Sequence, residues 1–194
     1  MTKPLLGQKI AVLVANGFAE DDLISMQKAM MDAGGDIRII SMDNGLVHSW
    51  NHDGWGLNYA PDQVLNRALA ADYDMLVVPG GRRSVEKLEL TAHTRRFIGG
   101  FVNCGKKVVC FEDAVELLLM VEGTQDIVVS GPERLHEIAI EHGYEWFDGA
   151  YMISGNVMTG QSNGQAHEEF AARATCFLIE AADAEKTARQ LEAA

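Results

Sequence analysis

The sequence predicts an α/β fold, in which a doubly wound, mostly parallel sheet is flanked by helices on both faces. Short apolar segments alternate along the chain with longer segments of helix-forming composition, which is the order of strand–helix–strand units. The apolar segments are continuous, as in KIAVLVA at residues 9–15. Continuous apolarity is typical of strands that are buried on both faces of a parallel sheet.

The elements are expected in the following order. Buried strands are predicted at residues 9–15, 36–42, 74–79 and 107–111, and shorter strands at 127–130, 150–154 and 156–160. Helices are predicted at residues 20–33, 62–71, 91–104, 114–121, 132–142 and 168–191. The polar segment 43–60, rich in Gly, Asn, His and Trp, predicts a loop or a hairpin.

Length and composition indicate one folded domain. The chain has 194 residues, of which 47% are hydrophobic and 23% charged, and a domain of this size can bury a substantial core. We therefore expect a single domain over residues 1–194, with fraying limited to the ends at 1–8 and 185–194.

Charge and cysteine content restrict the partners and the compartment. The formal net charge of −12 repels phosphate backbones and anionic membrane surfaces, so neither nucleic acid nor a membrane is expected as a partner. Three scattered cysteines, Cys104, Cys110 and Cys176, predict neither a disulfide framework nor a zinc site. No apolar run approaches the roughly 20 residues of a membrane span, and residues 1–8 lack the apolar core of a signal peptide. A cytoplasmic protein is expected.

The fold class predicts where a ligand would bind. In an open parallel sheet, the ligand crevice lies beyond the carboxyl ends of the strands. The loops after the first, third and fourth strands, at residues 16–22, 80–84 and 112–114, should therefore carry the site.

Those loops resemble the ThiJ/PfpI family, which is similar to class I glutamine amidotransferases. The similar stretches, in order, are GFAEDDL at 17–23, HDGW at 52–55, VPGGR at 78–82, GYEWFD at 143–148 and Gly-Asn at 155–156. The resemblance implies a flavodoxin-like sandwich and a homodimer or higher homo-oligomer. It also implies a small-molecule ligand and an intracellular-protease-like active site built on a nucleophile elbow.

The resemblance also implies a Cys-His-Gly nucleophile on the turn after the fourth strand. An ungapped alignment on Gly105, Lys106, Leu117 and Leu118 places Glu112 at the cysteine position, followed by Asp113 and Ala114. Choosing Cys110 as the nucleophile would shorten the strand by two residues. Cys110 is therefore interpreted as a buried, inert thiol.

A carboxylate cannot replace a thiolate in the same acyl transfer, so cysteine-dependent protease, amidase or glyoxalase activity is not expected. One hypothesis is a non-catalytic, ligand-binding or regulatory pseudoenzyme in which Glu112 merely caps a helix. The alternative is a hydrolase or lyase acting on a small carbonyl or amide compound, with Glu112, Glu20 and Asp113 as catalytic groups. The sequence leaves open which of Glu20, Asp21 and Asp22 faces Glu112. No cofactor is expected, and oxygen ligation of a hard cation is a weaker alternative.

Further residues receive provisional roles. Gly80, Gly81 and Arg82 are expected to bind the ligand, the glycines through a tight turn rather than through phosphate contacts. Arg82 and Arg83 would pair with an anionic ligand, pair with crevice carboxylates or remain solvated. His52 and Trp55 would roof the crevice or join a dimer contact. His167, which is followed by two glutamates, is interpreted as an exposed helix start.

Overall fold

The computed structural model describes residues 3–161 and 165–192 and contains the expected mostly parallel sheet. Its seven strands lie in the order β11-β12-β8-β7-β1-β3-β6. Neighbouring strands are parallel except β11 and β12, which form an antiparallel hairpin. The strands are β1 (Lys9–Val14), β3 (Asp36–Ser41), β6 (Gln63–Val64), β7 (Met75–Val78), β8 (Lys107–Phe111), β11 (Tyr151–Ser154) and β12 (Val157–Gly160).

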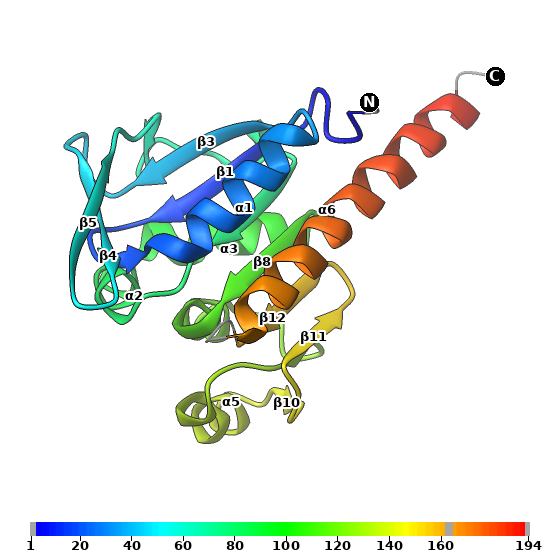
Figure 1. The fold of residues 1–194 in the computed structure, drawn as a ribbon. Coiled ribbons are helices and arrows are strands. Elements are labelled where there is room, and N and C mark those ends of the chain that lie inside the picture. Colours follow the sequence, from blue (N-terminus) through cyan, green and yellow to red (C-terminus); the bar gives the residue numbers. More distant parts are fainter. Residues whose placement is uncertain (1–2, 162–164, 193–194) are drawn as a thin grey trace.

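Helices cover both faces of this sheet (Figure 1). The helices α1 (Glu20–Asp32) and α6 (Gln165–Glu192) pack on one face, and α3 (Ala92–Asn103) packs on the other. In β1, the side chains of Ile10, Val12 and Val14 join the core between the sheet and helices α1 and α6. Those of Ala11 and Leu13 join the core on the α3 side. Both sets of side chains are fully buried, which explains why the strand is apolar at every position.

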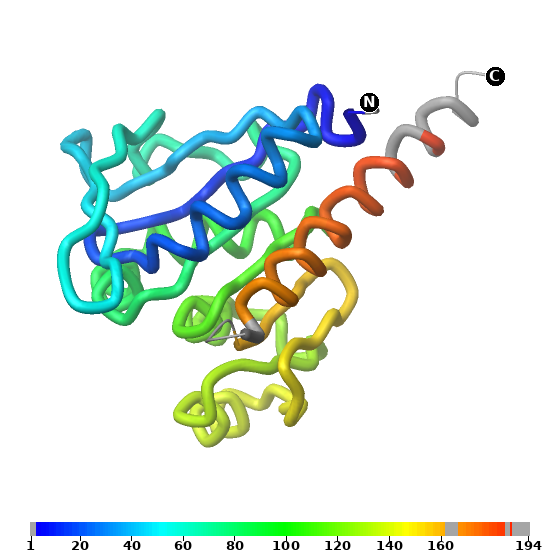
Figure 2. Tube along the Cα trace, viewed as in Figure 1, coloured from blue at the N-terminus to red at the C-terminus, as the bar shows by residue number. Residues whose placement is uncertain are grey.

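The remaining elements are short. The helices are α2 (Arg82–Glu89), α4 (Val115–Leu119) and α5 (His136–Glu141), with 3-10 turns η1 (Ala70–Asp72), η2 (Glu112–Ala114) and η3 (Glu133–Leu135). A three-stranded sheet consists of β2 (Phe18–Ala19), β4 (Val47–Asn51) and β5 (Gly54–Tyr59), and a two-stranded sheet of β9 (Val128–Val129) and β10 (Glu145–Trp146). The chain trace in Figure 2 carries the β4–β5 hairpin beside the start of α1.

The structure differs from the prediction at residues 62–71 and at residues 82–89. The helix predicted at residues 62–71 is wrong, because residues 63–64 form β6 along the edge of β3 and only η1 follows. Pairing with the open edge of β3 satisfies backbone N–H and C=O groups of both strands. A helix as short as the predicted one is only marginally stable on its own. The helix α2 was not predicted, because Gly80-Gly81 indicated a loop. It begins directly after Gly81, which adopts a left-handed φ of 105°.

Parts of the two ends expected to fray, residues 1–2 and 193–194, lie outside the described residues. In the described part of the expected N-terminal frayed end, Leu5 is fully buried and its N–H donates to the Ala33 carbonyl at 2.9 Å. Helix α6 continues to Glu192. Among the helices of the described residues, none has the length and apolar character that a membrane crossing requires.

Candidate functional site

The turn after β8 is strained at the residue that was expected to occupy the elbow. Glu112 has a φ of 46°, in the left-handed region, directly after the last strand residue, Phe111. This conformation costs a non-glycine residue roughly 1–2 kcal/mol and clusters at functional sites. The sharp turn brings the Glu112 side chain into a cleft of about 820 Å³ at the carboxyl ends of the strands.

The α1 carboxylate beside Glu112 is Asp22. Its Oδ2 atom accepts a hydrogen bond of 2.7 Å from the Gly80 N–H, and the side chain is only 3% exposed. A side chain at Gly80 would meet both Asp22 Oδ2 and the Glu112 Cβ at 3.0 Å. Gly80 is therefore needed for the two acidic residues to approach each other, because any side chain at this position of the turn would lie between them.

His167 completes this group from α6. Its Nδ1 atom lies 3.2 Å from Asp22 Oδ1, and its Nε2 atom lies 3.2 Å from the Asp21 carbonyl oxygen. The ring also packs against Phe111, with 6.5 Å between the centroids. His167 lies in the first turn of α6, as expected of a helix start, but its side chain is only 16% exposed, so the expected exposure is wrong. The sequence signal, one histidine at a helix start, did not reveal that α6 delivers it to Asp22.

Glu20 lies elsewhere, although it was expected beside Glu112. Its Oε1 atom accepts hydrogen bonds from Ser49 Oγ at 3.0 Å and from the Leu57 N–H at 2.9 Å, both in the β4–β5 hairpin. Burial opposes ionisation of this carboxyl, but the hydrogen bonds from Leu57 and Ser49 outweigh it and lower the pKa of Glu20. Glu20 thus ties the hairpin to α1. Of the three acidic residues among which the sequence left the choice open, Asp22 lies beside Glu112.

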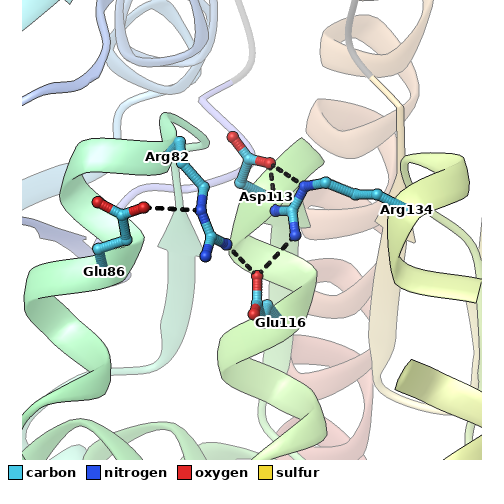
Figure 3. Close-up of polar contacts among 5 residues, drawn as sticks. All are labelled: Arg82, Glu86, Asp113, Glu116 and Arg134. Carbon is cyan, nitrogen blue, oxygen red and sulfur yellow. Dashed lines mark hydrogen bonds and ion pairs between the residues drawn. The ribbon is translucent and has the colours of Figure 1, made fainter. Parts of the chain in front are cut away.

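Asp113 takes part in an ion-pair network (Figure 3). Arg134, on η3, donates to Asp113 Oδ1 from Nε at 3.1 Å and also from a terminal nitrogen, and donates to Glu116 Oε2 at 2.9 Å. Arg82 pairs with the same Glu116 oxygen and with Glu86, at 3.0 Å. The network links α2, α4 and η3 beneath the elbow.

Arg82 therefore pairs with Glu86 and Glu116, which do not line the cleft, instead of with the crevice carboxylates that were one of its expected partners. Arg134 was not predicted from the sequence. Gly81 lines the cleft, and a Cβ at this position would lie 2.6 Å from the Gly17 carbonyl oxygen. Arg83 lies over the Trp50 ring, 4.2 Å from its centroid, so it faces the hairpin.

The turn of the β4–β5 hairpin forms one wall of the cleft. His52 has a left-handed φ of 44°, and its Nε2 atom lies 3.1 Å from Asp21 Oδ2. His52 lines the cleft, in agreement with its open role as a roof. Trp55 stands on the outside of the hairpin, 59% exposed, in edge-to-face contact with Trp50.

Cys110 lies within β8 and is fully buried in the core on the α3 side. Burial raises the pKa of the Cys110 thiol to about 12, which leaves almost none of it as reactive thiolate near neutral pH. The interpretation of Cys110 as a buried, inert thiol is confirmed.

The charges of the cleft define what it can do. It is lined by the carboxylates of Asp21, Asp22, Glu112, Asp113 and Glu168 and by the imidazoles of His52 and His167. Carboxylates and imidazoles are the usual groups for proton transfer. In the described part of the chain, no three His, Cys, Asp or Glu side chains are arranged to hold a metal ion.

The parallel sheet with a strained strand-to-helix turn at its carboxyl edge defines a class of α/β sandwich proteins built around an elbow. The DJ-1/PfpI family model matches residues 8–175, and this chain belongs to that family.

Individual relatives agree with this assignment. The chain is 25% identical over 157 residues to YraA of Bacillus subtilis strain 168, whose name provisionally calls it a cysteine protease, covering 81% of this chain and 90% of YraA. It is 24% identical over 162 residues to "Deglycase PfpI" of Pyrococcus furiosus, covering 82% of this chain and 93% of that protein. The structure of a ThiJ/PfpI domain protein from Brachyspira murdochii superposes with a TM-score of 0.77 at 16% identity, covering 90% of this chain and 98% of that one.

Proposed function

We propose that this protein is a non-catalytic, ligand-binding or regulatory member of the DJ-1/PfpI family, whose cleft at Glu112 holds a small molecule without thiol chemistry. The observation that carries the proposal is the strained Glu112 at the end of β8. A side chain held in this conformation faces the cleft at the point where the resemblance places the cysteine.

The position of the thiols supports the proposal. Cys110 is buried in the core, and no cysteine of the described residues lines the cleft. Cys104 lies at the end of α3, before β8 begins, and Cys176 lies on α6. A cysteine-dependent activity like that named for YraA would therefore lack its nucleophile here.

A second candidate function is supported by the contact between Asp22 and His167. Both ring nitrogens of His167 face acceptor oxygens, so the ring satisfies both contacts when each nitrogen carries a proton. A carboxylate-oriented imidazole beside Glu112 is an arrangement suited to general acid–base chemistry on a small carbonyl or amide compound. In this hypothesis Asp22 and His167 replace Glu20 as the partners of Glu112.

Turnover assays separate the two functions. Wild type and Glu112→Gln would be tested on methylglyoxal, a peptide amide and glutamine. The non-catalytic proposal expects no turnover by either protein, and turnover that Glu112→Gln abolishes while the fold persists would overturn it. Glu168→Gln, which changes an exposed carboxylate on the rim of the same cleft, is the matched control.

A cysteine introduced at the elbow tests the position itself. In Glu112→Cys, the new thiol is expected to react with iodoacetamide in the native protein while buried Cys110 does not, because residue 112 lines the cleft. Equal rates at the two positions would argue against an elbow at residue 112.

We also propose that the protein is cytoplasmic and forms a homodimer or a higher homo-oligomer. Exposed apolar side chains on the edge strand β5, Trp55 at 59% and Leu57 at 61% exposure, support self-association. Light scattering of wild type and Trp55→Asp would test it, because a hairpin interface predicts a smaller species for the variant.

A further inference from the structure

A second cleft, of about 530 Å³, lies between the segment 131–136 and the loop 146–150. It shares no lining residue with the cleft at Glu112. Two of its lining residues, His136 and Trp146, belong to α5 and β10, and Figure 1 shows these two elements away from α1 and the β4–β5 hairpin.

Aromatic rings form one wall of this second cleft. The rings of Trp146 and His136 stack, with centroids 5.3 Å apart and planes inclined by 25°. The Trp146 Nε1–H donates to Asp148 Oδ1 at 2.9 Å, so two contacts fix the indole plane. Phe147 lies beside it, 44% exposed. Its ring covers Gly149 so closely that a Cβ there would collide with it.

The loops that bear these rings are anchored to the core. Ser130 Oγ donates to the Gly149 carbonyl at 2.6 Å, and Gln161 Nε2 donates to the Gly131 carbonyl at 2.9 Å. A wall held in this way needs little reorganisation when a ligand arrives, which favours binding.

The charged groups around the rings are mainly acidic. Glu133 and Asp148 line the cleft, and no lysine or arginine of the described residues does so. His136 is the remaining titratable group of the lining. The faces of aromatic rings attract cations, and nearby carboxylates add to that attraction.

From this combination we propose that the second cleft binds a small organic cation, such as a quaternary ammonium compound. The cation packs on the rings of Trp146 and Phe147, with Asp148 and Glu133 supplying the opposite charge. Because the cleft is open, the expected affinity for a simple ligand such as choline is on the order of 1 mM.

An NMR titration with choline tests the proposal. The chain has three tryptophans, and Trp146→Phe identifies the Trp146 indole N–H signal. Choline is expected to shift this signal and leave those of Trp50 and Trp55 unchanged. The uncharged analogue of choline, in which a tert-butyl group replaces the trimethylammonium group, is expected to bind at least about tenfold more weakly.

Two variants separate charge from packing. Asp148→Asn keeps an oxygen that can accept from the Trp146 indole but removes the charge, and it should weaken choline binding about threefold to tenfold. Trp146→Ala should abolish binding, and the exposed hairpin variant Trp55→Phe should leave it unchanged. Asp148 is exposed, so its variant remains informative even if Trp146→Ala does not fold.

Three results would overturn the proposal: equal affinity for choline and its uncharged analogue, an unchanged affinity in Asp148→Asn, or no shift of the Trp146 signal at about 100 mM choline, far above the expected dissociation constant.

Discussion

Replacing Glu89 by glutamine should stabilise the protein near neutral pH. The Glu89 Oε1 atom is buried and has no hydrogen-bond partner in the described part of the chain. Burial, and then the charge of neighbouring Glu116, raise the pKa of Glu89 above its ordinary 4.5. The folded state therefore favours the protonated acid. The stabilising effect of that proton is complete below pH 4.5 and is lost as the pH rises through the raised pKa.

The size of the effect follows from the contacts. Glutamine keeps the shape of Glu89, removes its charge and supplies an N–H that can donate to Glu116. Repulsion between two partly solvated carboxylates is worth about 1 kcal/mol, and a hydrogen bond gained contributes a similar amount at most. We expect a gain of about 1 kcal/mol in the free energy of unfolding at pH 7, or roughly 2–4 °C in Tm.

Urea unfolding of wild type and Glu89→Gln at pH 7 and pH 4 measures this change in the free energy of unfolding. The gain should be present at pH 7 and nearly absent at pH 4, where Glu89 of the wild type holds its proton. Glu86→Gln, on the same helix, removes an exposed ion pair with Arg82 and should cost no more than about 0.5 kcal/mol. A loss of stability in Glu89→Gln at pH 7, or the same gain at both pH values, would refute the reasoning.

Three other predictions concern the core and the network around the elbow. Cys110→Ser should lower the free energy of unfolding by about 1–3 kcal/mol, because it buries a hydroxyl in an apolar core, and mass spectrometry should find Cys110 unalkylated in the native wild type. Glu20→Gln should lose about 1–2 kcal/mol at pH 7, because charged hydrogen bonds such as that from Leu57 are weakened. That loss, followed by urea unfolding, should shrink below pH 4.5 as the lowered pKa of Glu20 is approached; a loss independent of pH would contradict the assignment. Arg134→Met should lower the free energy of unfolding, measured in urea, by about 1 kcal/mol, because its ion pairs with Asp113 and Glu116 are removed; an unchanged stability would show the pairs to be weak.

The sequence by itself determined the fold class. Continuous apolar runs such as residues 9–15 require burial on both faces, and the structure places alternate side chains of β1 in two different cores. It also determined that Cys110 is buried within β8, because a small apolar side chain in such a run has no route to solvent. The predicted turn at Glu112 follows from the same local pattern, in which an apolar run ends and a short helix begins.

Only the tertiary structure decided which groups surround Glu112. Glu20, Asp21 and Asp22 follow one another on the first turn of α1, and helical geometry sends them in different directions. Their partners come from distant segments: the hairpin for Glu20 and His167 of α6 for Asp22. Arg134 likewise reaches Asp113 across 21 positions. These contacts depend on how the helices and loops pack against the sheet, and local propensity and apolar periodicity carry no information about them.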